Sequence, residues 1–117
     1  MLAPTEIRLR RAEKLLEIDF DDGSSFVLPA EYLRVESPSA EVQGHGPNER
    51  KTIAGRQHVG ILGLEPVGNY AVRIMFDDLH DTGIFSWEYL HELGRERMRK
   101  WQAYLDALQR QGLRRSP

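Results

Sequence analysis

Four side chains able to ligate a cation or to transfer protons fall within five consecutive residues of this chain. They are Asp77, Asp78, His80 and Asp81. Carboxylates and imidazole bind metal ions and act as general acids and bases, so the cluster suggests a metal-dependent enzyme or a metal-binding protein that uses His80 with neighbouring aspartates. No second acid or nucleophile stands at a recognisable spacing from the cluster, which weakens the catalytic hypothesis.

A structural interpretation of the same cluster is simpler. Turns between strands are rich in aspartate, and an earlier acidic stretch at residues 19–22 has three aspartates and no histidine. The three other histidines of the chain are His45, His58 and His91. None of them forms a metal-ligand spacing with His80, and a lone histidine after a strand is more often a hydrogen-bonded structural residue. We therefore favour a solvated turn.

The rest of the chain contains no familiar catalytic or cofactor motif. There is no cysteine, so there is neither a thiol nucleophile nor a thiolate ligand for zinc. The loop glycines do not follow a strand in the pattern of a nucleotide-binding loop. Ser86 stands between Phe85 and Trp87 rather than in a Gly-x-Ser-x-Gly elbow, so it is expected to cap a helix. We predict no catalytic residue and no bound cofactor.

The acidic cluster lies in the second of two similar stretches that are expected to position it. Residues 16–33 read LEIDFDDGSSFVLPAEYL, and residues 72–90 read VRIMFDDLHDTGIFSWEYL. Each begins with alternating apolar residues, continues through Phe-Asp-Asp and ends in Glu-Tyr-Leu. The chain therefore reads as two copies of a strand-turn-strand-helix unit. Two copies are too few for an open solenoid, so we expect them to pack into one domain.

Hydrophobic periodicity predicts an α+β fold. We expect a small, mainly antiparallel sheet of about five to seven strands, built from the two related units, with the helices on one side. Strands are expected near residues 6–10, 16–20, 26–28, 59–67 and 72–76, with a short one before Ser86. Helices are expected at 30–35, from Ser86 to a stop or kink at Gly94, and at 95–111. The last helix should dock on the sheet through Met98, Trp101, Leu105 and Leu108.

One long segment breaks this regular pattern. Residues 36–58 contain two of the six prolines, three glycines and no hydrophobic period. Loops of this length within a compact domain are usually functional or disordered. We therefore expect residues 36–58 to be a surface loop and part of an interaction surface.

Length and composition set the class of protein. At 117 residues, 40% hydrophobic and 29% charged, the chain is expected to form a single globular domain over 1–117. No apolar run is long enough for a membrane span, and the first residues lack the apolar stretch of a secretory signal. We therefore expect a cytoplasmic protein that does not bind membranes.

The net charge of −2 conceals an asymmetry between the two ends of the chain. Residues 1–93 carry nine basic and sixteen acidic side chains, whereas residues 94–117 carry seven basic and two acidic ones. A basic tail is compatible with an acidic partner or with nucleic acid. No aromatic residues alternate with the basic ones in a groove-like pattern, so we favour the solvated face of an amphipathic helix over nucleic-acid binding.

Four longer motifs resemble the gamma-butyrobetaine hydroxylase-like N-terminal domain family. They are LPAEYLR at 28–34, SPSAEVQGH at 37–45, EPVGNYAVR at 65–73 and HDTGIFSW at 80–87. They occur in the family's order and span nearly the whole chain. The resemblance is to the small stand-alone bacterial proteins of unknown function in this family. Other members are fused to Mrp-type iron-sulfur carrier ATPases or precede the catalytic domain of carnitine-pathway oxygenases, which is absent here.

The resemblance also implies a metal site that this chain has lost. In the oxygenases a structural zinc is held by a Cys-x-Cys-x-x-Cys loop and a later histidine, and these positions correspond to Ser37, Ser39, Val42 and His80. Hydroxyls and a valine do not replace thiolates, so no tight zinc site is expected. Relatives tend to carry glycine at position 79, where this chain has Leu79, and we expect the turn there to be reshaped.

From these observations we expect a non-enzymatic accessory or adaptor domain that binds a protein partner. The relatives fused to iron-sulfur carrier ATPases suggest that class of partner and a role linked to iron-sulfur or metal cofactor handling. The chain itself is expected to be a monomer or a weak homodimer. The expected interaction surface comprises Arg34, His45, Tyr70, Asp78, His80 and Asp81.

Overall fold

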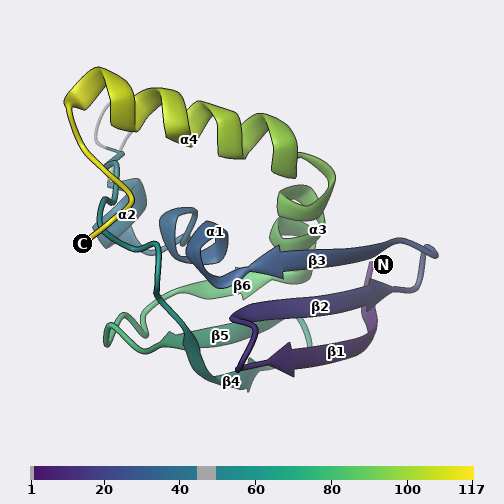
Figure 1. Ribbon diagram of the computed structural model, residues 1–117. Coiled ribbons are helices and arrows are strands. Elements are labelled where there is room, and N and C mark those ends of the chain that lie inside the picture. The colour runs from purple at the N-terminus through teal and green to yellow at the C-terminus, as the bar shows by residue number, and fades with distance from the viewer. Residues whose placement is uncertain (1, 45–49) are drawn as a thin grey trace.

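A computed structural model describes residues 2–44 and 50–117 of the chain. Six strands in these residues form two three-stranded antiparallel sheets, ordered β1-β2-β3 and β4-β5-β6. The strands are β1 (Pro4–Arg10), β2 (Leu15–Phe20), β3 (Ser25–Pro29), β4 (Ile61–Val67), β5 (Ala71–Phe76) and β6 (Ile84–Ser86). The helices are α1 (Ala30–Val35), α2 (Ala40–Gln43), α3 (Trp87–Arg95) and α4 (Arg97–Gln111). The α+β fold predicted from the sequence is confirmed, and Figure 1 shows α1, α3 and α4 on one side of the strands.

The strands follow the alternation of the sequence. In β2, Leu16, Ile18 and Phe20 are buried, while the residues between them are only partly covered. The central strand of the other sheet, β5, buries Val72, Ile74 and Phe76 in the same way. Side chains from both sheets and from α1 and α3 meet in one hydrophobic cluster. A period of two along each strand thus places one face of each sheet in a shared core.

The predicted duplication is present in three dimensions, and its first copy is β2-β3-α1. Here Phe20 forms two backbone hydrogen bonds across the turn at residues 21–24, called the first turn below. Its carbonyl accepts from Gly23 at 3.1 Å, and its N–H donates to the Ser24 carbonyl at 2.8 Å. Gly23 has φ +89°, and a Cβ added to it would meet nothing within 4 Å. Only the backbone conformation therefore favours glycine at this position.

The second copy is β5-β6-α3, and its turn at residues 77–80, called the second turn below, repeats these bonds. The Phe76 carbonyl accepts from Leu79 at 3.1 Å, and the Phe76 N–H donates to the His80 carbonyl at 3.0 Å. Leu79 has φ +70°. The expectation of a reshaped turn is therefore wrong: the turn keeps its form, and a leucine adopts the left-handed conformation.

Local sequence explains where the helix α3 begins and ends. Ser86 caps it as predicted, since its hydroxyl accepts from the Tyr89 N–H at 3.1 Å. Gly94 does not end the helix, which continues to Arg95. A Cβ at Gly94 would lie 2.3 Å from the ring of Phe26, so glycine is needed here for close packing against β3.

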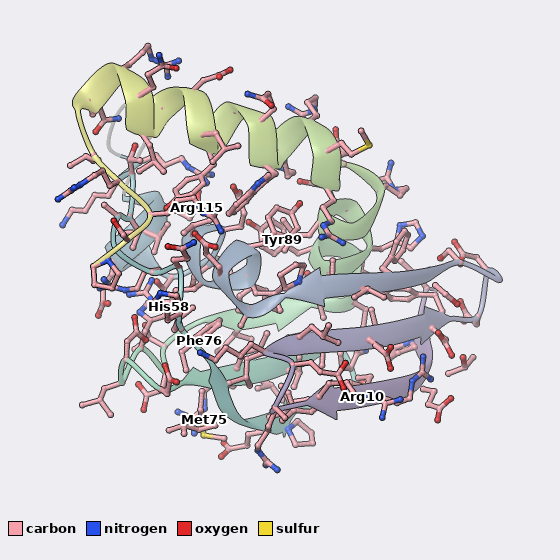
Figure 2. All side chains as sticks on the ribbon, viewed as in Figure 1. Arg10, His58, Met75, Phe76, Tyr89 and Arg115 are labelled. Atoms are coloured by element: carbon pink, nitrogen blue, oxygen red, sulfur yellow. The ribbon has the colours of Figure 1, made fainter. Side chains whose placement is uncertain are left out.

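The long helix α4 crosses over α1 and α3 (Figure 1). It buries Tyr104 and Leu108, and Trp101 lies edge-on to Tyr32 of α1. Met98 was expected on the docking stripe, but this expectation is wrong, since its residue is 89% exposed. Figure 2 places Arg115 on the inner side of α4.

The segment after α4 returns along the loop that precedes β4. The Gly55 N–H donates to the carbonyl of Arg114, and Arg115 forms a two-pronged ion pair with Glu31 of α1 at 2.9 and 2.7 Å. The guanidinium of Arg115 also lies over the Trp101 ring, 5.3 Å from its centroid. These contacts tie the basic tail to the domain.

The segment 36–58 contains no strand in its described part, and its only helix there is the four-residue α2. The strand β4 begins at Ile61, two residues later than expected. None of the helices in the described residues is long and apolar enough to cross a membrane.

Candidate functional site

His80 lies at the centre of a buried hydrogen-bond network that joins the second turn to the start of segment 36–58. Its Nε2 is 2.9 Å from the Ser37 hydroxyl and 3.3 Å from the Ser39 hydroxyl. Its Nδ1 is 3.2 Å from a carboxylate oxygen of Glu41 on α2. His80 is 5% exposed and Ser37 is fully buried. A turn and a distant loop are thus joined through one imidazole.

Electrostatics keep this imidazole neutral. Burial lowers the pKa of His80, the positive charge of Arg34 lowers it further, and Glu41 and Asp78 only partly oppose that change. A neutral ring has one N–H and one free nitrogen. The contacts fit a ring whose Nδ1–H donates to Glu41 and whose Nε2 accepts a serine hydroxyl hydrogen. The network is satisfied without a positive charge inside it.

The order Ser37, His80, Glu41 is that of a nucleophile, a base and an orienting acid. Its surroundings argue against this chemistry, because the Ser37 hydroxyl has no exposure through which a substrate could reach it. A Cβ added to Gly83 would lie 2.5 Å from that hydroxyl oxygen, so backbone packs directly against it. The arrangement therefore fixes the loop and offers no accessible nucleophile.

The same residues test the zinc site that the resemblance implies. The structure brings Ser37 and Ser39 onto His80, and it buries Val42 on α2, whose N–H donates to the Ser39 carbonyl at 3.1 Å. Three of the four positions, Ser37, Ser39 and His80, therefore meet in one hydrogen-bond network. The chemistry of the four positions does not fit zinc, since two hydroxyls and an isopropyl group replace three thiolates. Hydrogen bonds among Ser37, Ser39 and His80 join these positions instead.

A second feature of this region is an ion-pair cluster beneath the second turn. One carboxylate oxygen of Asp78 accepts from Arg34 at 2.8 Å and from Arg56 at 2.7 Å. The other accepts from the His80 N–H at 3.2 Å. Burial alone would raise the pKa of Asp78, but Arg34 and the other donors outweigh it and lower the pKa below its usual value. The carboxylate thus stays charged and holds α1 and the loop before β4 to the turn.

Arg34 is 6% exposed, so the Asp78 carboxylate is needed to stabilise its buried positive charge. Its Nη1 finds no hydrogen-bond partner within the described residues. A buried guanidinium with one counter-ion is stable only while that counter-ion remains.

The remaining aspartates of the cluster point elsewhere. Asp81 is exposed and lies 3.8 Å from Arg73 on β5. A carboxylate oxygen of Asp77 packs against Gly60, and a Cβ added to that glycine would lie 2.9 Å from the oxygen. Neither aspartate contacts the His80 ring, and the described ranges contain no group of three or more histidine or acidic side chains arranged around a metal position.

The predicted interaction surface divides into three parts. Arg34 and His80 are buried and support the second turn from within, whereas Asp78 is partly covered and Asp81 is exposed. Tyr70 is 55% exposed but precedes β5, while the second turn follows it, so the six-residue strand places them about 20 Å apart. His45 falls outside the described residues.

One surface residue was not expected from the sequence. The side chain of Leu79 projects from the second turn and its residue is 83% exposed. A shallow hollow of about 230 Å³ lies beside this turn. Its lining consists of Gly55, Arg56, His58, Val59, Asp77, Asp78 and Pro117. Sequence reasoning also missed Arg56 and Glu41, because nothing in an aperiodic loop shows which turn it will pack against.

Comparisons with known proteins agree with this architecture. The sequence pattern described as gamma-butyrobetaine hydroxylase-like, N-terminal, matches residues 7–91. Two solution NMR structures, at 46% and 43% identity, cover the whole chain with TM-scores of 0.86 and 0.85, and the chain covers 92% and 87% of them. A crystal structure of a DUF971-family protein of unknown function from Acidithiobacillus ferrooxidans is 41% identical, with a TM-score of 0.65, over 78% of this chain and 91% of that one. No curated protein matches the chain.

Proposed function

The chain belongs to the gamma-butyrobetaine hydroxylase-like, N-terminal family, and we propose that it is a non-enzymatic cytoplasmic accessory domain that binds a protein partner. The observation that carries this proposal is Leu79. A large apolar side chain is 83% exposed on a turn where its backbone is held at φ +70°. A non-glycine residue in this conformation costs about 1–2 kcal/mol, and solvation of its side chain returns none of that cost.

The support beneath Leu79 is rigid. Asp78, on one side of it in sequence, bridges two arginines, and His80, on the other side, is hydrogen-bonded to Ser37. Both neighbours are thus fixed by contacts with the interior of the domain, and the side chain of Leu79 between them is exposed. A preorganised apolar side chain at a fixed place is what a protein interface requires, because little entropy is lost when a partner covers it.

A metal-dependent activity that uses His80 has less support. Both ring nitrogens of His80 have partners inside the domain, and the carboxylate of Asp78 is occupied by Arg34 and Arg56. A ligand that binds the folded chain must raise its melting temperature. Titration with zinc, manganese and iron(II) should therefore leave the melting temperature unchanged, and a metal-dependent rise would favour the metal hypothesis.

The class of partner follows from the family by analogy alone. Relatives fused to iron-sulfur carrier ATPases suggest that a separate chain of that kind is the partner here, with a role in iron-sulfur or metal cofactor handling. The domain would then supply a docking face and the partner the chemistry.

Affinity capture from the native host tests the proposal. The tagged chain should retain a reproducible partner, and Leu79→Gly should lose it, although glycine suits the turn and keeps the domain folded. Met98→Ser is the matched control, because Met98 is also an exposed apolar residue but lies on α4. Capture that is equal for all three chains, or absent for the wild type at low salt, contradicts the proposal.

A further inference from the structure

A groove with a basic rim lies between α4 and residues 50–52. It has a volume of about 250 Å³. Its basic side chains are Arg50, Lys51, Arg99 and Lys100. Small or apolar residues from α4 and α1 complete the lining together with Thr52, and Glu36 is its one acidic residue. Residues far apart in the sequence thus place four cations around one hollow.

The positive charge of this groove is only partly neutralised. Glu36 is buried and pairs with Arg50 at 2.9 Å. Arg99 and Lys100 pair with Glu96 and Glu92, which are outside the lining. Lys51 forms no ion pair within the described part of the chain, so the groove has an excess of cations over carboxylates.

We propose that this groove binds an acidic peptide segment of the partner protein, with carboxylate side chains on its cationic rim. This inference rests on the proposed function. Charge complementarity selects the ligand, because excess cations raise the local concentration of anionic groups and speed their association. The volume lies below the range of drug-sized sites, so the groove takes one or two side chains of a chain that passes over it.

The lining favours a peptide over a nucleic acid. Ala103 and Ala107 are one helical turn apart on α4, and their small side chains let an extended backbone approach the helix. Single-stranded nucleic acids bind through exposed aromatic rings. Tyr104, the aromatic residue of this lining, is buried, and its hydroxyl donates to the Ile53 carbonyl. No stacking platform accompanies the cations among these residues.

Fluorescence anisotropy with the purified chain tests the groove directly. The probe is a labelled peptide of alternating glutamate and leucine, and its control is the same peptide with glutamine for glutamate. The glutamate peptide should bind and the glutamine peptide should not, and binding should weaken as salt approaches about 0.15 M. Lys51→Glu and Arg99→Glu should each weaken binding about fivefold, as expected for reversal of one exposed charge.

Arg114→Glu is the matched control, since it reverses an exposed charge of the same basic tail outside the groove lining. It should leave peptide affinity unchanged, and melting curves should show all three variants folded. Equal losses of peptide affinity for Arg114→Glu and Arg99→Glu would show that only the net charge of the protein matters, and this would overturn the proposal. Tighter binding of inorganic phosphate or of a labelled oligonucleotide than of the glutamate peptide would overturn it as well.

The groove and the accessory function can fail separately. A partner that is captured equally by wild type and by Lys51→Glu, with no peptide binding, leaves the accessory function standing and refutes the groove. Peptide binding that Lys51→Glu and Arg99→Glu weaken supports the groove even where Leu79→Gly has no effect on capture.

Discussion

The first and second turns share one backbone hydrogen-bond pattern, but their side chains make different contacts. In each, a phenylalanine bonds to the third and fourth residues of the turn, and the second aspartate accepts from the N–H of the fourth. In the first turn that aspartate, Asp22, accepts from the Ser24 hydroxyl and pairs with Nε2 of His91. In the second, Asp78 neutralises a buried arginine. The same turn geometry thus forms an exposed connection in one copy, and in the other it anchors α1 and the loop that contains Arg56.

The difference lies at the last two positions of each turn. The first turn ends in Gly23 and Ser24, and the second ends in Leu79 and His80. Glycine relieves the positive φ, whereas leucine keeps the strain and exposes an apolar group. Ser24 donates to Asp22 within its own turn, whereas His80 bonds to Ser37 in a loop outside the turn. The proposed function therefore rests on side chains that differ between the two copies, because the backbone of the turn is common to both.

The largest expected effect comes from placing thiolates in the loop that packs on His80 of the second turn. The variant Ser37→Cys/Ser39→Cys/Val42→Cys should bind zinc with His80, with an apparent free energy on the order of 10 kcal/mol. The geometry is suitable, because the serine hydroxyls lie 2.9 and 3.3 Å from Nε2, near the roughly 3.5 Å between nitrogen and sulfur on a tetrahedral zinc. Metal analysis and a zinc-dependent rise in melting temperature measure it.

The control for this prediction exchanges one residue between the copies. His80→Ser gives the second turn the serine of the first, and in the triple-cysteine background it should weaken zinc binding markedly, because three ligands and water replace four protein ligands. Zinc bound equally well without the imidazole would show that the four positions do not share one site.

The next largest effect distinguishes Asp78 from Asp22, which are the second aspartates of the two turns. Asp78→Asn should lower the free energy of unfolding by about 3 kcal/mol, because it leaves the charge of Arg34 buried without its counter-ion. Asp22→Asn removes a carboxylate whose side chain is 44% exposed, and its effect should be much smaller. Urea unfolding of both variants measures this difference. Equal losses in the free energy of unfolding would show that Asp78 is no more important to stability than Asp22.

A smaller effect on stability, of opposite sign in the two copies, is expected from substitutions at the third residue of each turn. Leu79→Gly should stabilise the domain by about 1 kcal/mol, because it removes left-handed strain. Gly23→Leu should destabilise it by a similar amount, since the backbone strains although nothing lies within 4 Å of the new Cβ. Thermal unfolding measures both. Loss of stability in Leu79→Gly would mean that the leucine side chain packs on the domain.

Much of this arrangement could be predicted from the sequence, since it depends on local pattern. The strands, α1 and the Ser86 cap follow from alternation and from capping chemistry, and the duplication follows from Phe-Asp-Asp. The convergence of Ser37 with His80 was predicted only through the family resemblance. No period in the chain links these two residues.

The features that could not be predicted depend on the path of a loop. Arg56 reaches Asp78, and Glu41 reaches His80, only because segment 36–58 folds back over the second turn. Met98 has the spacing of a buried residue, yet its residue is 89% exposed. Such contacts are set by tertiary packing, which a periodic pattern does not describe.

The smallest effect is a difference in the pH at which each copy begins to lose stability. The folded pKa of His80 is depressed below its usual 6.5, first by burial and then by Arg34, with Glu41 and Asp78 opposing. As the pH falls, His80 in the unfolded chain therefore binds a proton at a higher pH than His80 in the folded chain. The second copy keeps full stability above pH 6.5 and loses part of it as the pH falls from there through the folded pKa.

The first copy should respond only in stronger acid. Hydrogen bonds from Ser24, followed by His91, lower the pKa of Asp22 from 3.8 to about 2. Its contribution is complete above pH 3.8 and is lost as the pH falls through 2. Unfolding between pH 7 and 5 should therefore show a small decline in wild type that His80→Gln removes and Asp22→Asn retains. A decline that persists without the imidazole would assign the titration to another group and would remove this distinction between the copies.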